Sequence, residues 1–137
     1  MIARQMYLFQ NLEKAFLMAN VLFEHVYYME QRKIMAETKI FNTKGKEKLC
    51  FVLQQYGFIY KSDQDFMDVI DKYISQTRNH IAHYGLFKLG TDQIPDAIKF
   101  VELASRLLAK ILGIQLPAGA SDTRDWLVEL AGRQNKS

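Results

Sequence analysis

Apolar side chains recur every three or four residues through most of this chain, which is the spacing of helices that bury one face. The pattern predicts four main helices, at about residues 4–30, 44–57, 63–84 and 94–112, and a short fifth at about 122–131. No stretch alternates apolar and polar residues in the way of a half-buried strand. The sequence therefore predicts an all-α fold, a bundle of four to five helices.

The first predicted helix carries large apolar side chains on more than one face. Phe16 and Phe23 belong to one stripe, and Met18 and Val21 lie outside it. Two interpretations stay open: the helix lies at the centre of the bundle, or its second face meets another copy of the chain. His25 lies among apolar neighbours on this helix and is expected to pack at the edge of the core.

Composition narrows the class of protein. The chain has 137 residues, which indicates one domain, with residues 1–112 forming the bundle and residues 113–137 a linker and a short C-terminal helix of the same domain. Its 49% hydrophobic content is enough for a core, and 24% charged residues argue against global disorder. The single cysteine, Cys50, excludes an internal disulfide and fits a cytoplasmic protein. No signal peptide and no membrane-spanning run is recognised.

The net charge of +3 permits nucleic-acid binding without requiring it. The most basic region begins in residues 31–43, expected to be a loop or a weak short helix, and continues into the second predicted helix. Lys44, Lys46 and Lys48 lie at the start of that helix. Such a charge run is either a solvated surface or a rim that contacts phosphates.

The end of the third predicted helix concentrates reactive side chains, with an arginine and two of the three histidines between Arg78 and His83. At about 100° per residue, Asn79 and His83 share the polar face opposite the apolar stripe, and Ser75 shares it too. Arg78 falls on the flank between the two faces. Tyr84 continues the apolar stripe, and Gly85 is expected to end the helix.

These residue types suit phosphate chemistry. A histidine transfers protons near neutral pH, an arginine binds a phosphate through parallel N–H donors, and an asparagine orients either one. No acidic cluster for a divalent metal accompanies them, so the trio suits metal-independent cleavage in which the RNA 2′-hydroxyl is the nucleophile. The alternative is a helix end where a basic residue and a histidine simply favour the C-terminal dipole.

Arg78, Asn79 and His83 form an Arg-polar-x3-His pattern late on an amphipathic helix, which resembles the HEPN superfamily. The resemblance implies a helical bundle that forms a homodimer, with two motifs meeting in a cleft that cuts RNA without a metal or other cofactor. It also implies toxin–antitoxin or defence systems, with an antitoxin or regulatory partner. In this interpretation Arg78, Asn79 and His83 are catalytic. The expected RNA contacts are Lys44, Lys46, Lys48 and Tyr84.

One departure concerns a subset of the superfamily, paired with a nucleotidyltransferase antitoxin, that carries a tyrosine two places after the histidine. Here Tyr84 follows His83 directly and Gly85 takes the next place, which argues against the subset alone. Two other functions are alternatives. One is a non-catalytic module that binds RNA, a nucleotide or a partner protein. The other is a metal site built from His25, Cys50, His80 and His83, which lacks acidic or thiol ligands at matching spacing.

Overall fold

The computed structural model describes residues 2–60, 66–85, 93–114 and 123–136, and describes side chains for residues 11–60, 66–85, 94–114 and 123–133. Every regular element in these ranges is helical, which confirms the predicted all-α class. None of the described helices is both long and apolar enough to cross a membrane.

The elements follow one another as α1 (Ile2–Gln31), α2 (Glu37–Asn42), α3 (Gly45–Gln55), α4 (Phe66–Ile70), a π-helical turn (Asp71–Ser75), α5 (Gln76–Tyr84), α6 (Gln93–Ile111) and α7 (Thr123–Lys136). Most bounds lie within two residues of the predicted ones. The last helix continues to Lys136, beyond the predicted end at residue 131. The predicted starts at residues 63 and 122 lie outside the described residues.

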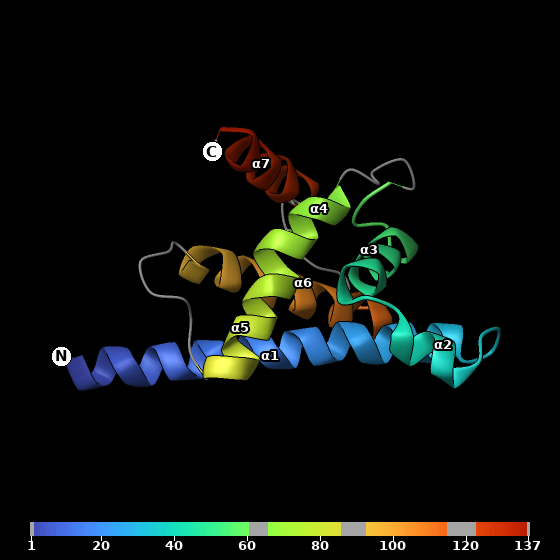
Figure 1. The fold of residues 1–137 in the computed structure, drawn as a ribbon, viewed down its shortest axis with the longest axis horizontal. Coiled ribbons are helices and arrows are strands. Elements are labelled where there is room, and N and C mark those ends of the chain that lie inside the picture. The colour runs from blue at the N-terminus through green and yellow to red at the C-terminus, as the bar shows by residue number, and fades with distance from the viewer. Residues whose placement is uncertain (1, 61–65, 86–92, 115–122, 137) are drawn as a thin grey trace.

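The long helix α1 forms the base of the molecule, and α6 runs alongside it in the same direction (Figure 1). The ring of Phe100 on α6 packs between those of Phe16 and Phe23 on α1, at centroid distances of 5.2 and 5.3 Å. All three rings are almost completely buried. Because burial of a phenylalanine stabilises by about 1.5–3 kcal/mol, this contact anchors the core.

The segment from α4 to α5 is one continuous helix that crosses α1, interrupted by the π turn (Figure 1). Within the turn, the backbone N–H of Gln76 donates to the carbonyl oxygen of Asp71, five residues earlier. The side chain of Gln76 spans the same turn, with Nε2 donating to Asp71 Oδ2 at 3.1 Å. A uniform α-helix was predicted here, and for these residues the prediction is wrong.

The π turn changes which side chains face inward. Ser75 was predicted to face outward with Asn79 and His83, but it is buried, because the wider turn rotates it toward the start of α3. Tyr84, predicted to continue the apolar stripe, is 63% exposed in the last turn of α5. Gly85 ends α5 in the left-handed conformation, with φ 78°, as predicted.

The prediction for His25 is also wrong, because this side chain is exposed rather than packed at the core edge. Its neighbour Val21, one turn earlier on α1, is itself 49% exposed. The two residues lie on the face of α1 that points away from the bundle. Apolar neighbours on a helix therefore did not mark the buried side here.

Two sets of side-chain hydrogen bonds connect the ends of helices. Lys110 Nζ, on α6, donates to the carbonyl oxygen of Tyr56 at the end of α3, at 2.6 Å. Asp96 on α6 accepts from Arg133 Nη2 at 2.8 Å and from Trp126 Nε1 at 3.4 Å, both on α7. The bonds of Asp96 connect α7 to α6, and α7 also packs against α4.

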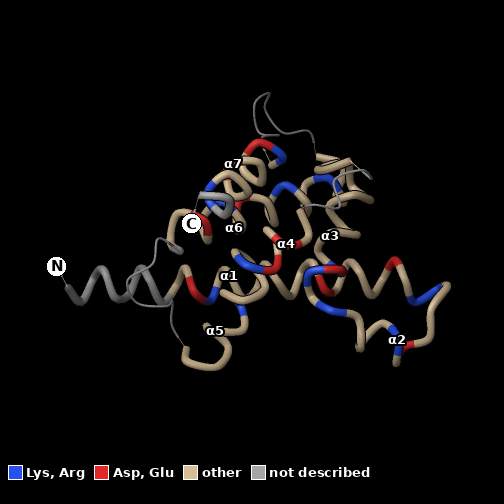
Figure 2. The backbone as a smooth tube through the Cα atoms, turned by 45° about the horizontal axis from the view of Figure 1, so that its top comes forward, with Lys and Arg blue, Asp and Glu red and all other residues tan. Residues whose placement is uncertain are grey.

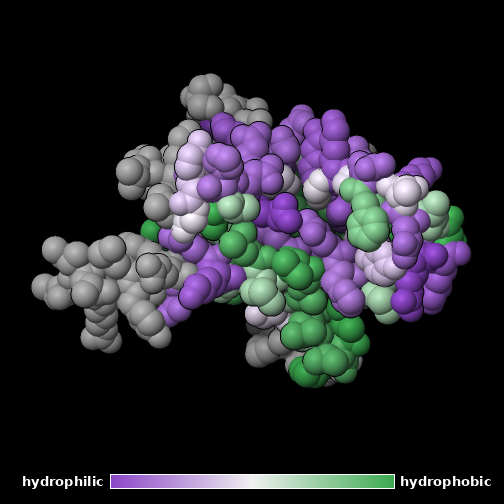
Figure 3. Space-filling model, turned by 60° about the horizontal axis from the view of Figure 1, so that its bottom comes forward, coloured by the Kyte–Doolittle hydropathy of each residue, from purple (hydrophilic) through white to green (hydrophobic). Residues whose placement is uncertain are grey.

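Large apolar side chains remain exposed on α1 and α6, which lie side by side. Figure 3 shows apolar side chains gathered in one band on the face that it presents. We call the exposed apolar residues of these two helices, taken together, the apolar strip: Met18, Val21, Met29, Ile98, Leu108 and Ile111. Those of α1 lie on the face of that helix that points away from the bundle. Its extent on α1 agrees with the surplus apolar surface noted in the sequence.

Candidate functional site

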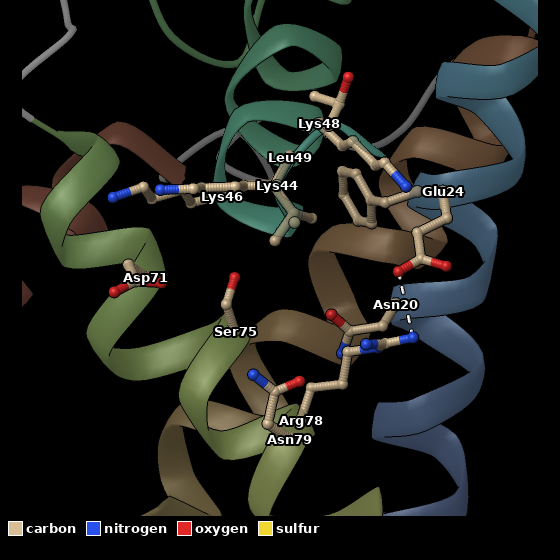
Figure 4. A pocket seen from close by; sticks show the side chains of 13 residues that line it. Asn20, Glu24, Lys44, Lys46, Lys48, Leu49, Asp71, Ser75, Arg78 and Asn79 are labelled. Carbon is tan, nitrogen blue, oxygen red and sulfur yellow. Dashed lines mark ion pairs between the residues drawn. The ribbon is translucent and has the colours of Figure 1, made fainter. Parts of the chain in front are cut away.

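A cavity of about 360 Å³ opens where the start of α3 faces the π turn, the start of α5 and the middle of α1 (Figure 4). We call it the α3 cavity. Five residues predicted as site residues line it together: Arg78, Asn79, Lys44, Lys46 and Lys48. The two stretches are about thirty residues apart in sequence, so the fold itself brings them to one place.

Arg78 is held at the wall of the α3 cavity by an ion pair with α1. Its Nη2 lies 3.1 Å from Glu24 Oε1, and each of the two side chains is 36% exposed. A partly exposed pair of this kind contributes about 0.2–1 kcal/mol to stability. Its larger effect is on position, because it directs the guanidinium toward α1 and away from the end of α5.

The three lysines belong to the first turn of α3 or immediately precede it. Lys44 is the N-cap residue, in an extended conformation, and no side chain caps the helix. Positive side chains at a helix N-terminus are unfavourable, because they face the positive end of the helix dipole. Figure 2 shows basic segments concentrated where the chain leaves α2 and enters α3. The opening of the α3 cavity is therefore a region of positive potential.

Two carboxylates also line the α3 cavity, and both already have partners. Glu24 pairs with Arg78, and Asp71 accepts the hydrogen bond from Gln76. Among the described residues, no ion pair or hydrogen bond occupies the ammonium groups of the three lysines. The unneutralised charge of the cavity is therefore positive, which suits an anionic ligand.

Ser75 and Asn20 are buried polar residues of the α3 cavity that the sequence did not single out. Asn20 Nδ2 donates to the carbonyl oxygen of Phe16, 3.0 Å away on the same helix. Ser75 Oγ is buried and has no hydrogen-bond partner among the described residues. The signal for Asn20 and Glu24 was present in the sequence, because they are polar residues four apart within a largely apolar helix.

His83 and Tyr84 do not line the α3 cavity. Both are exposed in the last turn of α5, with ring centroids 4.6 Å apart in an edge-to-face contact. His83 lies one helical turn beyond Asn79, about 6 Å further along the axis. The half-buried His80 also packs against Tyr84, with ring centroids 4.6 Å apart. The motif is thus divided between the cavity and the adjacent helix end.

Within the described part of the chain, no three His, Cys, Asp or Glu side chains lie close enough together to hold a metal ion. Cys50, one of the residues considered for such a site, is buried in the core. The arrangement can bind an anion at the α3 cavity, next to an exposed histidine.

No protein-family model, curated protein or solved structure matches this chain.

Proposed function

We propose that this chain is a metal-independent endoribonuclease of the HEPN type, a toxin or defence effector that cuts RNA at a composite site formed across a homodimer. The observation that carries the proposal is the α3 cavity, in which Arg78 and Asn79 meet three lysines from another part of the chain. A positive cavity beside an exposed histidine suits a polyanion whose phosphates are bound and cut.

In the proposed reaction the RNA 2′-oxygen attacks the adjacent phosphorus, and the bond from phosphorus to the 5′-oxygen breaks. His83 of one copy takes the proton from the 2′-hydroxyl, and His83 of the second copy gives a proton to the leaving 5′-oxygen. Arg78 binds the scissile phosphate and stabilises its growing charge. Asn79 holds either Arg78 or His83 in position. The products are a 2′,3′-cyclic phosphate and a 5′-hydroxyl.

Two considerations support the proposed homodimer. One protomer supplies a single His83, whereas two copies related by a two-fold axis supply both an acid and a base. The apolar strip gives a second copy a surface to cover, since large exposed apolar patches mark interaction sites. An antitoxin or regulatory protein is a further partner in this proposal.

A specific observation favours a second candidate, a non-catalytic module that binds RNA, a nucleotide or a partner protein. His83 lies outside the α3 cavity, so the lysines, Arg78 and Asn79 can hold an anion without it. In that case the protein binds RNA with the same residues and leaves it intact.

Incubation of the purified protein with RNA, with and without chelator, separates these functions. Cleavage that persists in chelator and fails on RNA methylated at the 2′-oxygen of the cut site supports the endoribonuclease. His83→Ala is expected to lower the rate by about 10²–10⁴-fold. Arg78→Ala is expected to be similarly damaging, and Arg78→Lys to restore it only in part, because an ammonium lacks two aligned donors. Asn79→Ala is expected to have a milder effect.

His80→Gln is the matched control, since His80 is a half-buried histidine of the same helix that packs against Tyr84. It is expected to lower stability more than activity. Full activity in the His83→Ala protein, or loss of activity on adding chelator, would exclude the proposed mechanism. Tight RNA binding by the parent without any cleavage would favour the non-catalytic module.

A further inference from the structure

We propose that the inner end of the α3 cavity is a binding site for one phosphate group, formed by the Ser75 hydroxyl, the first backbone amides of α3 and the lysines around them. The choice of RNA as the molecule that carries this phosphate rests on the proposed function. The site differs from the one proposed for the scissile phosphate, because its donors are Ser75 and the start of α3 rather than Arg78 and His83, and His83 does not line the cavity. It would hold a phosphate that is bound and not cut.

The first turn of α3 has unused hydrogen-bond donors. The N–H groups of Glu47 and Lys48 both donate to the carbonyl oxygen of Lys44, at 3.1 Å. No hydrogen bond of the described chain uses the N–H groups of Gly45 and Lys46, and no side chain caps the helix. Unused amides at the positive end of a helix dipole are the donors that bind phosphates in many proteins.

The independent sign of a ligand is the hydroxyl of Ser75. This residue is only 9% exposed, and its Oγ has no partner in the described chain although it is buried. Figure 4 shows the hydroxyl directed into the cavity, toward the start of α3. A buried hydroxyl without a partner is unfavourable and rare, so its presence at a cavity wall indicates a bond to a bound group.

The hydroxyl and the helix start converge on one place. A Cβ atom built on Gly45 would lie 3.5 Å from Ser75 Oγ, so the hydroxyl faces the first residue of α3 at the distance of one added methyl group. The π turn is what brings Ser75 there, and π turns recur at functional sites. Hydroxyl and amide donors therefore approach the same point from two helices.

The positive charge of the cavity favours an anionic ligand, and the number of its hydrogen-bond donors favours a phosphate. Lys44, Lys46 and Lys48 line the cavity without ion-pair partners among the described residues, whereas its carboxylates are engaged. A tetrahedral phosphate has enough oxygens to accept from a hydroxyl, two amides and an ammonium at once. The volume of about 360 Å³ leaves room for the sugar to which the phosphate is attached.

Binding to an RNA that cannot be cut tests this site independently of activity. The probe is a fluorescein-labelled single-stranded RNA with 2′-O-methyl groups throughout, measured by anisotropy at several salt concentrations. Ser75→Ala is expected to weaken binding by about tenfold or more, since it removes a hydrogen bond to a charged group. Its salt dependence is expected to stay that of the parent, because no charge is removed. Lys44→Gln is expected to lower the slope of log affinity against log salt by about 0.7.

Two further variants sharpen the test. Gly45→Ala places a methyl group in contact with Ser75 Oγ at an ordinary distance, so the fold is retained while access to the hydroxyl is reduced. Ser105→Ala is the matched control, a serine on the exposed side of α6 whose hydroxyl, among the described residues, bonds only to the carbonyl oxygen of Val101. Gly45→Ala is expected to weaken binding like Ser75→Ala, and Ser105→Ala to bind like the parent.

The source of the phosphate is read from two forms of the probe, one with a 5′-phosphate and one with a 5′-hydroxyl. A Ser75→Ala effect on both forms identifies an internal phosphodiester, and an effect on the 5′-phosphate form alone identifies a terminal phosphate. Equal affinity of parent, Ser75→Ala and Gly45→Ala for both forms overturns the proposal, even if the parent cleaves RNA. Conversely, a parent that binds through Ser75 but never cleaves retains this site and loses the proposed activity.

Discussion

Replacing Ser75 by alanine is expected to make the protein more stable. The hydroxyl of Ser75 is buried without a partner, and burying such a group costs about 1–3 kcal/mol. Alanine also favours a helix over serine by about 0.5 kcal/mol. The loss of one oxygen leaves a gap smaller than a methyl group, beside a cavity that is already open. The net expectation is a gain of about 1–3 kcal/mol in the free energy of unfolding, and each 1 kcal/mol corresponds to about 4 °C in Tm for a chain of this size.

Urea unfolding followed by circular dichroism measures this gain, with thermal unfolding as a second readout. Ser105→Ala is again the control, because it gains the same helix propensity but loses a hydrogen bond to Val101, and is expected to change stability little. A Ser75→Ala protein that is less stable than the parent would refute the reasoning, since it would show that the hydroxyl is satisfied in solution. Higher stability together with weaker phosphate binding is the signature of a residue kept for function.

Three other outcomes follow from the structure. Glu24→Gln removes a negative charge from the wall of the α3 cavity and is expected to strengthen RNA binding about three- to tenfold at low salt. Burial and a hydrogen bond from its hydroxyl to Glu30 raise the pKa of Tyr56 above its ordinary value of 10.0. The unfolded state therefore loses this proton first, stability falls as pH rises above 10, and Tyr56→Phe is expected to fall less steeply in urea titrations. Leu108→Glu within the apolar strip is expected to convert a dimer to a monomer in sedimentation, with little change in Tm.

Matched variants control for these changes. Glu102→Gln also removes a carboxylate from an exposed helix position but lies outside the α3 cavity, and it is expected to leave RNA affinity nearly unchanged. Ile34→Glu places a charge at a 79% exposed apolar residue outside the apolar strip, and should leave the assembly intact. A parent that sediments only as a monomer at tens of micromolar would contradict the homodimer, and weaker RNA binding by Glu24→Gln would assign Glu24 a supporting role.

Periodicity was enough to predict the fold class and the helix positions, because each main helix has an apolar face against a common core. It placed Phe16 and Phe23 on one stripe, and both are buried. It failed at Ser75, since a wheel drawn at a constant 100° per residue cannot include a turn that is one residue wider. It failed at His25 because an apolar stripe on α1 is exposed, and periodicity does not distinguish a buried stripe from an exposed one.

The sequence was enough to name candidate site residues but not to predict which of them lie together. Residue type identified Arg78, Asn79 and the lysines, yet only the fold shows that they line the same cavity. Glu24 belongs to the site through its ion pair with Arg78, a contact between residues far apart in sequence. His83, by contrast, is close to Arg78 in sequence and still lies outside the cavity. Short sequence distance therefore gave a poor measure of which side chains line the same cavity.

The π turn sets the angular phase between the two halves of one helix. Upstream of it, α4 packs against α3 and α7, and downstream of it, α5 packs against α1. A regular α-helix has one apolar stripe, which would pack less well against neighbours on two different sides. The extra residue of the π turn rotates the downstream half by roughly 100° relative to the upstream half. In this rotated phase Arg78 reaches Glu24. A single-residue deletion between positions 71 and 75 would therefore reset the direction of Arg78 and Asn79 together, although it would remove neither of them.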